Sequence, residues 1–506
     1  MSQRFYVTTA IPYVNARPHI GFAMEIIQAD VLARHRRLRG DDVRFQTGTD
    51  DNSLKNVQAA EAEGVPTQEF VDRNAEMFKD LREPLDLSFD DFIMTSSDSR
   101  HAPGVERLWN ACQERGDLYK QHYEGLYCVG CEQFYAPSEL IDGKCPEHGT
   151  VPQLVSEENW FFRLSKYADQ LRELITSGEL RIEPASRRNE VLGFINTGLA
   201  DFSVSRSKER ARGWGVPVPG DDSQVMYVWY DALGNYISAL DFGANGEQYQ
   251  RYWTEGGRRV HCIGKGIIRF HAVYWPAMLL SAGQALPTEI FVHDYLTVDG
   301  RKIGKSMGNA IDPVALTEEY GTEALRWWLL RDVPRVGDAD FTLARLVNRA
   351  NEDLSNGFGN LTNRVVSMVH KYRDGAVPEL SGKADDISAA LLEAIDGAPA
   401  EIDAALDDFD FRRATAALWN IVDQGNKLVE SAAPWTLAKA ERNGDADAAA
   451  QLDVVLGVLV KACRAVAHEL QPFLPRAAQK LADQTGVGTG RVAPAAPVFP
   501  RLELAE

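Results

Sequence analysis

A strand, a short loop and a helix near the amino terminus constrain the fold of this chain most strongly. Residues 4–11 are rich in β-branched and aromatic side chains, as buried strands are. Residues 12–18 begin and end with proline, which predicts a loop. Apolar residues at helical spacing then run from Ile20 towards Gly40, a residue type that favours helix ends. These residues predict one βα unit.

The first turn of the predicted helix is suited to bind phosphate. A helix N-terminus presents unpaired N–H groups and the positive end of the helix dipole. Gly21 would let a phosphate approach the backbone, and His19 could donate a hydrogen bond to it. Taken alone, this motif is equally typical of a buried histidine beside a helix cap, so other parts of the chain must decide.

Length and composition indicate a soluble protein of several domains. The chain has 506 residues, of which 44% are hydrophobic and 25% charged. No stretch reaches the 18 or more apolar residues of a membrane span, and the N-terminus lacks a signal-peptide core. We therefore expect a cytoplasmic protein with no membrane partner. A net charge of −19 means that any nucleic acid must meet a local basic face.

Strand and helix patterns alternate in two stretches, which predicts a parallel sheet with ligands at the carboxyl ends of its strands. Residues between these stretches form short, turn-rich pieces, whereas residues after 343 have long amphipathic helical patterns. The predicted fold class is α/β, a Rossmann-type doubly wound sheet with a zinc-bearing insertion, followed by an all-α helical bundle. The predicted domains are 1–115 with 227–290 (catalytic), 116–226 (insertion), 291–343 (stem-contact region, with a loop of glycines and lysines) and 344–506 (helical bundle with a C-terminal tail).

The insertion contains four residues at the spacing of metal ligands: Cys128, Cys131, Cys145 and His148. Three thiolates and one imidazole complete a tetrahedral set, which predicts one structural zinc ion. Chance cysteines in a loop are the alternative. The other cysteines lack such partners and are expected in the core; they are Cys112, Cys262 and Cys463.

A second loop, residues 299–306, combines glycine with two lysines. Gly300 and Gly304 are separated by three residues rather than four, so the loop is not a Walker motif. Lys302 and Lys305 could neutralise charge that develops on a leaving pyrophosphate. A solvated basic turn is the alternative for this loop alone.

With both loops considered, the chain resembles class I aminoacyl-tRNA synthetases, and within them the methionyl-tRNA synthetase family. The H-I-G-H signature stands as residues 19–22 and the K-M-S-K-S signature as residues 302–306. The family's other characteristic stretches stand at residues 10–13 (AIPY), 48–50 (GTD), 227–232 (YVWYDA) and 263–271 (IGKGIIRFH). The resemblance covers essentially the whole chain.

The resemblance implies the family's substrate sites. Catalysis is carried over to His19, Gly21, Lys302 and Lys305, with Mg²⁺ bound to ATP. The implied ATP-binding residues are His19, Gly21, Glu25, Gly264, Lys302, Lys305 and Ser306. Asp50 would hold the α-ammonium of L-methionine, and the implied side-chain pocket consists of Ile11, Tyr13, Trp229, Ala232, Leu233, Tyr236, Ile267 and His271. A flexible thioether suits such an aromatic-walled pocket.

The resemblance also implies recognition of the tRNA anticodon by the helical bundle. The family's N-x-x-x-R turn and P-W pair place this role on Asn360, Arg364 and Trp435. Asn360 and Arg364 are four residues apart and hence share one helix face. An amide, a guanidinium and an indole can bond to and stack on unpaired bases. Initiator and elongator tRNA(Met) are the expected partners.

The chain departs from the family pattern at four places. Phe22 replaces the final histidine of the first signature, and Ile303-Gly304 replaces Met-Ser in the second. Residues 51–53 read Asp-Asn-Ser, where the family usually has Glu-His-Gly. Gly266 stands where aspartate is common. These changes bear on ATP affinity rather than on the retained His19 and lysines.

The expected activity is ATP-dependent activation of L-methionine to methionyl-adenylate, followed by transfer to the 3′ end of tRNA(Met), by a monomer. Other class I synthetases of the aliphatic or cysteine group are one alternative, but the aliphatic enzymes carry a larger editing insertion and the cysteine enzyme has zinc in its pocket. A catalytically silent tRNA-binding relative is a second alternative. A zinc-stabilised nucleotidyltransferase is a third, and it would leave the helical bundle unexplained.

Overall fold

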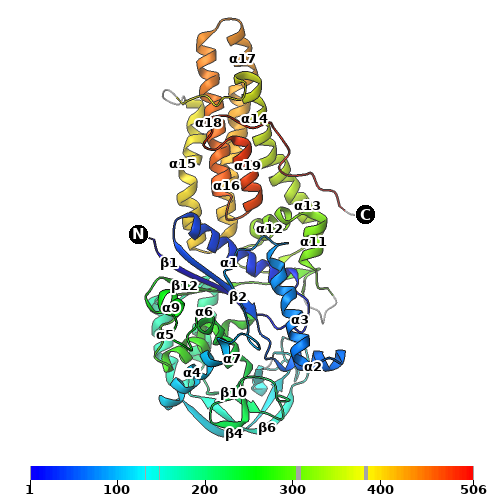
Figure 1. Ribbon diagram of the computed structural model, residues 1–506, viewed down its shortest axis with the longest axis vertical. Helices are drawn as coiled ribbons and strands as arrows, with labels where there is room; N and C mark the ends of the chain where they lie inside the picture. The colour runs from blue at the N-terminus through cyan, green and yellow to red at the C-terminus, as the bar shows by residue number, and fades with distance from the viewer. Residues whose placement is uncertain (1, 132, 148, 304–308, 381–385, 505–506) are drawn as a thin grey trace. The chain divides into compact units, whose positions relative to one another are not determined.

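The structure is a computed structural model that describes residues 2–131, 133–147, 149–303, 309–380 and 386–504 (Figure 1). Contacts divide the chain into two compact units. The first unit consists of Met1–Ala29, Arg39–Glu83 and Leu87–His293. The second consists of Asp30–Leu38, Pro84–Asp86 and Asp294–Glu506.

A six-stranded parallel sheet forms the centre of the first unit. Its strands lie in the order β3 (Asp91–Met94), β2 (Asp42–Thr49), β1 (Arg4–Thr9), β12 (Arg258–Gly264), β13 (Glu289–His293) and β7 (Arg181–Glu183). β1 pairs with β2 on one side and with β12 on the other, so the winding reverses at β1. In open α/β sheets, ligands bind at the strand carboxyl ends beside this reversal. The predicted doubly wound sheet is confirmed.

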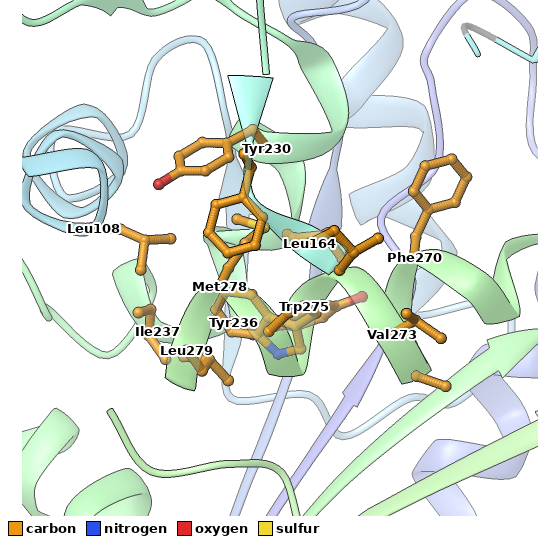
Figure 2. Close-up of a cluster of buried hydrophobic side chains, with 14 of the residues drawn as sticks. Leu108, Leu164, Tyr230, Tyr236, Ile237, Phe270, Val273, Trp275, Met278 and Leu279 are labelled. Atoms are coloured by element: carbon orange, nitrogen blue, oxygen red, sulfur yellow. The ribbon is translucent and has the colours of Figure 1, made fainter. Parts of the chain in front are cut away.

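Helices and a large apolar cluster surround this sheet. α1 (Ile20–Leu38), α2 (Leu54–Glu63), α3 (Thr67–Lys79) and α4 (His101–Glu114) follow the first strands. Figure 2 shows part of the cluster, with Tyr236, Trp275 and Met278 near its middle and Phe270 at its edge. Cys112, Cys262 and Cys463 are all buried, as predicted.

The insertion has more regular structure than its sequence predicted. β4 (Leu118–Cys128) and β6 (Gln153–Phe162) form a long antiparallel pair, flanked by β5 (Gln133–Tyr135) and β8 (Phe202–Ser203). We expected short, turn-rich pieces here. β4 has one end in the core and a middle largely open to solvent, so its apolar pattern is weak. α5 (Ala168–Ser177) and α6 (Ala185–Asn196) lie on either side of β7 in the sequence.

The second unit begins with a small sheet in which β14 (Leu296–Val298) lies between β15 (Arg301–Lys302) and β16 (Ala339–Asp340). Two helices follow β15, α11 (Pro313–Tyr320) and α12 (Thr322–Arg331). The predicted helical bundle is confirmed (Figure 1). Its helices are α13 (Leu343–Arg349), α14 (Asn360–Arg373), α15 (Asp386–Asp407), α16 (Phe411–Ala432), α17 (Pro434–Arg442), α18 (Ala446–Glu469) and α19 (Pro475–Thr485), with a π-helical segment Ala350–Gly359 before α14.

A buried arginine fixes several segments of the second unit to one another. The Arg326 guanidinium is 2.9 Å from the Asp30 carboxylate and donates to the carbonyls of Leu85 and Phe473. Its side chain is 1% exposed, so the ion pair and these carbonyls must satisfy its charge. Among the described residues, no helix is both long and apolar enough to cross a membrane.

Candidate functional site

The first turn of α1 fixes the orientation of the His19 ring. The N–H groups of Phe22 and Ala23 donate to the His19 carbonyl, and the Gly21 N–H donates to His19 Nδ1 at 3.0 Å. Because Nδ1 accepts this bond, a neutral His19 ring carries its proton on Nε2. A Cβ on residue 21 would lie 2.8 Å from His19 Cε1, so glycine gives the imidazole its room.

Phe22 stands where the family has histidine, and its side chain serves packing rather than hydrogen bonding. Its ring packs edge-on against Phe78 at 5.3 Å between centroids, within a cluster that includes Val14 and Phe70. An aromatic side chain here stabilises the contact between α1 and α3 rather than offering a hydrogen bond. The first signature of this chain therefore has one ring available for polar chemistry, that of His19.

Glu25 joins three parts of the first unit beneath this turn. One carboxylate oxygen accepts the Ala10 N–H at 2.8 Å, and the other is 2.7 Å from His293 Nε2. Both Glu25 and His293 are buried. This pairing ties the ends of β1 and β13 to α1, and no sequence motif pointed to His293.

Asp50 lies at the carboxyl end of β2, next to the loop after β1. Its N–H donates to the Pro12 carbonyl at 2.9 Å, and Tyr13 and Asp50 form an isolated parallel bridge. The Asp50 side chain is buried, and its carbonyl accepts from the Asn56 side chain at 3.0 Å. Lys55 lies 4.9 Å from the Tyr13 ring centroid. A buried carboxylate thus stands at a strand end whose backbone is fixed to the loop after β1.

The predicted pocket residues come from short elements after β11 (Asp221–Met226) and β12. α7 (Val228–Leu233) carries Trp229, Ala232 and Leu233, α8 (Asn235–Ser238) carries Tyr236, and a π-helical turn, Phe270–Tyr274, carries His271. Tyr236 belongs to the apolar cluster, and Tyr13, Trp229 and Ile267 pack against it. Ile11 lies in the loop after β1. The structure therefore brings together Tyr13, Trp229, Tyr236 and Ile267 around one cluster.

His271 is held as a neutral ring in that pocket. Its Nδ1–H donates to the Ile267 carbonyl at 2.9 Å, so Nε2 accepts the Tyr236 hydroxyl proton at 2.7 Å. Burial lowers the pKa of His271 to about 4. The pKa of His261, whose ring lies 4.1 Å from that of Tyr236, is also lowered by burial. Both imidazoles are therefore uncharged at neutral pH, which suits an apolar substrate group.

A polar network behind the pocket was not predicted from the sequence. Asp231 accepts from Asn52 Nδ2 at 2.7 Å and from His101 Nε2 at 2.5 Å, and the other His101 nitrogen contacts the Ser238 hydroxyl. Asp231, His101 and Ser238 are all fully buried. The network ties α7 and α8 to the end of β2. Its hydrogen-bonded residues Asn52 and Asp231 are 179 residues apart, so spacing could not reveal it.

Asp51, beside Asp50, is a buried acid. Its carboxylate accepts from the Ser96 N–H and hydroxyl at 3.2 and 3.1 Å, and its backbone carbonyl accepts from Trp214 and Asn56. Burial raises the pKa of Asp51 to about 6 despite those hydrogen bonds. At position 51 the departure from the family exchanges one carboxylic acid for a shorter one, so a titratable group stays next to Asp50.

The cysteines of the insertion form a compact cluster. The sulfur atoms of Cys128, Cys131 and Cys145 all lie within 4.8 Å of one another, and Cys131 and Cys145 are 3.3 Å apart. The Tyr135 hydroxyl is 3.1 Å from the Cys131 sulfur. These three sulfurs could hold a metal ion. The fourth predicted ligand, His148, lies outside the described residues.

The remaining predicted site residues fall into three groups. Gly264 ends β12, and the exposed Gly266 follows it in a short 3-10 turn. The Lys302 backbone pairs with Thr297 in the second unit, whereas Lys305 and Ser306 lie outside the described residues. In the bundle, Asn360 begins α14, Arg364 donates to the Asn426 side chain at 3.4 Å, and Trp435 is 51% exposed.

Comparison with known proteins identifies two matching families. The family of class I tRNA synthetases (M) matches residues 5–153 and 135–366. The anticodon-binding domain of methionyl tRNA ligase matches residues 377–493. Together these matches cover most of both compact units.

Similar whole proteins are also known. The methionine–tRNA ligase of Brucella suis is 41% identical over 520 residues, which cover 99% of this chain and 98% of that protein. That of Mycobacterium bovis is 43% identical over 487 residues, which cover 95% and 92%. A solved structure of Mycobacterium tuberculosis methionyl-tRNA synthetase with methionyl-adenylate has a TM-score of 0.93 and 41% identity, covering 99% of this chain and 100% of that one. Its apo form has a TM-score of 0.87 and 38% identity, covering 100% and 99%.

Proposed function

This chain belongs to the methionyl-tRNA synthetase family of class I aminoacyl-tRNA synthetases, and we propose that it joins L-methionine to the 3′ end of tRNA(Met) at the expense of ATP. The reaction has two steps. Methionine first forms methionyl-adenylate, and the tRNA terminal adenosine then takes the methionyl group.

The observation that carries the proposal is the placement of Asp50. Asp50 offers a buried carboxylate at the end of β2, where its backbone pairs with that of Tyr13, and such a carboxylate can bind the α-ammonium of an amino acid. The neutral Tyr236–His271 pair and Trp229 then offer the side chain an apolar, aromatic surface. This combination favours methionine over charged and small polar amino acids.

In the first step, the methionine carboxylate attacks the α-phosphorus of ATP and pyrophosphate leaves. Positioning and charge stabilisation supply the catalysis, because no covalent intermediate with the protein is needed. His19 Nε2–H donates to a phosphate oxygen, with the α1 N-terminus behind it. Lys302 and Lys305 neutralise the leaving pyrophosphate, and Mg²⁺ on ATP would offset charge on the phosphate oxygens.

Three further assignments belong to this proposal. Glu25, Gly264 and Ser306 contribute to ATP binding, although Glu25 must share oxygens that already accept from Ala10 and contact His293. Cys128, Cys131 and Cys145, with His148, hold one structural zinc ion. Burial raises the pKa of the Cys131 thiol, so a bound cation is what would keep these sulfurs as thiolates.

The second step requires tRNA recognition by the bundle. We assign anticodon contacts to Asn360, Arg364 and Trp435. The exposed indole of Trp435 and the family match over residues 377–493, which contains Trp435, support this assignment. Initiator and elongator tRNA(Met) are both proposed substrates. The predicted domain boundaries stay part of the proposal. They are the sheet halves 1–115 and 227–290 as catalytic domain, the insertion 116–226, the connecting region 291–343 and the bundle 344–506. The monomeric state and the cytoplasmic location stay predictions.

Amino-acid-dependent ATP–pyrophosphate exchange with all twenty amino acids tests this function. We expect exchange with methionine alone. Asp50→Asn should lower kcat/KM for methionine roughly 100-fold, because a hydrogen-bonded charge pair is lost. Asp169→Asn, at a site 97% exposed on α5, is the matched control and should leave exchange unchanged.

Other outcomes would change the assignment. Exchange with a branched aliphatic amino acid instead of methionine would place the chain elsewhere in class I. Silence with all twenty, from protein that retains its fold, would favour a tRNA-binding relative without catalytic activity.

A further inference from the structure

A buried tyrosine lies against the cysteine cluster of the insertion. The Tyr135 hydroxyl oxygen is 3.1 Å from the Cys131 sulfur and 3.6 Å from the Cys145 sulfur. Those two sulfurs are 3.3 Å apart, so one phenol lies beside two of the predicted metal ligands. Tyr135 itself is 6% exposed. The spacing of the cysteines and histidine in the sequence did not point to this residue.

The strands of the insertion determine where this hydroxyl lies. In the antiparallel pair of β4 and β5, Leu126 is opposite Tyr135 and Cys128 is opposite Gln133. Directly opposite residues lie on the same face of a sheet, and so do residues two apart on one strand. Tyr135 and the predicted ligand Cys128 therefore share one face, and the backbone pairing of the two strands positions the phenol.

The direction of the hydrogen bond follows from the chemistry of the ligands. A neutral thiol can donate or accept, whereas a thiolate has no hydrogen and can only accept. Cysteine binds metal ions as the thiolate. Tyr135 has a single O–H group, and its shorter contact is with Cys131. In the loaded site the phenol therefore donates to the Cys131 thiolate.

The electrostatics of the cluster explain why such a donor is needed. Three thiolates and a neutral imidazole leave one negative charge in excess of the two positive charges of zinc. Cys128 and Cys145 are each 1% exposed, so water cannot solvate much of that charge. Hydrogen bonds to an ionised group are stronger than those between neutral groups. The Tyr135 O–H thus meets a charge that the protein itself must stabilise.

A second hydroxyl contacts the cluster in a different setting. Thr150 Oγ1 is 3.7 Å from the Cys128 sulfur, and Thr150 is exposed. Water can replace an exposed hydroxyl, whereas loss of a buried donor is not made good by solvent. The two hydroxyls therefore offer a comparison within one site, because the Tyr135 contact is short and buried and the Thr150 contact is long and exposed.

We propose that Tyr135 is a positioning residue of the metal site, whose O–H donates to the Cys131 thiolate and so raises the affinity of the insertion for zinc. This inference rests on the zinc site that is part of the proposed function. The hydrogen bond lowers the energy of a sulfur lone pair, which stabilises the thiolate against protonation and makes it a weaker nucleophile. Tyr135 therefore helps to retain the ion and protects the half-buried Cys131 from electrophiles.

The zinc-loaded full chain tests this role in competition with a zinc chelator. Tyr135→Phe keeps the ring and removes only the hydroxyl. Tyr119→Phe is the matched control, because it makes the same change on β4, where the hydroxyl donates to Asp201 at 2.8 Å. We expect Tyr135→Phe to weaken zinc binding roughly tenfold. Thr150→Val should weaken it by less than about threefold, because water replaces the hydroxyl, and Tyr119→Phe should leave it unchanged.

The cobalt(II)-substituted protein distinguishes a lost hydrogen bond from a change in packing. The thiolate-to-cobalt charge-transfer absorption moves to lower energy when a sulfur loses a hydrogen-bond donor, because the energy of its lone pair rises. We expect this shift in Tyr135→Phe and not in Tyr119→Phe. Methionine-dependent ATP–pyrophosphate exchange should stay at the parental level in every variant, which would show that the catalytic part of the chain is folded.

Three results would overturn the inference. The first is parental zinc affinity in Tyr135→Phe. The second is weaker zinc binding in Tyr135→Phe with an unchanged cobalt spectrum, which would make the tyrosine a packing residue. The third is an equal loss of affinity in Tyr119→Phe.

Failure of the proposed function gives a different result. A parent protein that binds no zinc would refute the proposed metal site and this role together. A parent protein that binds zinc but does not catalyse exchange would refute the proposed activation of methionine and leave the role of Tyr135 standing. Metal affinity and exchange therefore separate the two failures.

Discussion

The proposed methionine pocket lies beside an aromatic cavity, a hollow of about 850 Å³ whose lining includes Tyr123, Phe134, Phe194 and Phe202. The two share the Phe270–Trp229 stack, yet they are built by different means. In the pocket, polar atoms of Asp231, His101 and Tyr236 are fixed by hydrogen bonds in a buried setting. In the cavity, the half-buried aromatic rings offer flat apolar faces rather than directed hydrogen bonds. Hydrogen bonds specify atoms, whereas ring faces accept any flat group. The proposed pocket is therefore suited to discriminate between substrate side chains, whereas the cavity offers flat apolar surfaces.

The largest expected effect is loss of the metal from the cysteine cluster of the insertion, which should affect the aromatic cavity but not the proposed methionine pocket. Cys145→Ala should abolish binding of one zinc ion, because binding to such sites is worth about 10–16 kcal/mol in small zinc domains. The segment between Cys131 and Cys145 carries Phe134 and Tyr135, and the Tyr135 hydroxyl contacts the Cys131 sulfur. Loss of the metal should therefore disturb the insertion, so tRNA transfer should fall while pyrophosphate exchange persists. Metal content and the two assays check this. Cys112→Ala, in the core of α4, should keep the metal, and loss of metal there would contradict the assignment.

The next effect concerns the polar network of the pocket. Asp231→Ala leaves His101 and Asn52 without their shared acceptor in the core, which should destabilise the first unit by about 3–5 kcal/mol. Thermal unfolding of the variant measures this loss. Asp231→Asn keeps the shape and should cost less. Equal melting temperatures for the alanine variant and the parent would show that the network does not hold α7.

A third prediction concerns the pH dependence of stability at the buried Asp51. Its folded-state pKa of about 6 exceeds the usual value of 3.8, so the native protein binds this proton more tightly than the unfolded chain. The contribution of Asp51 to stability is therefore fully present below pH 4 and is lost as the pH rises to 6. Asp51→Asn removes this loss. Its unfolding free energy relative to the parent should increase by on the order of 3 kcal/mol between pH 4 and pH 7.

The smallest effect is expected at Asn52. Asn52→Ala removes one hydrogen bond to Asp231, worth about 1.5 kcal/mol at a half-buried position. Because Asn52 links β2 to the helix that carries Trp229, KM for methionine should rise severalfold with little change in kcat. Asn52→His, which restores the family's usual residue type, should recover much of the affinity. A fall in kcat without a change in KM would place Asn52 in another role.

The sequence predicted the parts of the molecule that depend on local pattern. Apolar runs located β1, β2 and β12, and helical spacing located α1 and the long helices of the bundle. The Asp50 position followed from a short motif at a strand end. In each case the information lies within about ten adjacent residues.

What the sequence did not predict depends on distant partners. His101 and Asp231 are 130 residues apart, and Glu25 and His293 are 268 apart, with no shared motif. The long β4–β6 pair was missed because its exposed middle lacks a clear alternation. The aromatic cavity draws its rings from separate strands, a helix and a π-helical turn, and each ring alone is typical of core packing.

Gly21 makes the residue at position 21 and the orientation of the His19 ring depend on each other, which limits how the first signature can vary. A side chain at position 21 would collide with the His19 ring at 2.8 Å, although the backbone itself would accept one. An alanine there would displace the imidazole, so that its Nε2–H no longer points towards the proposed phosphate position. A Gly21→Ala substitution would thus remove the hydrogen bond that His19 offers, although residue 19 itself is unchanged.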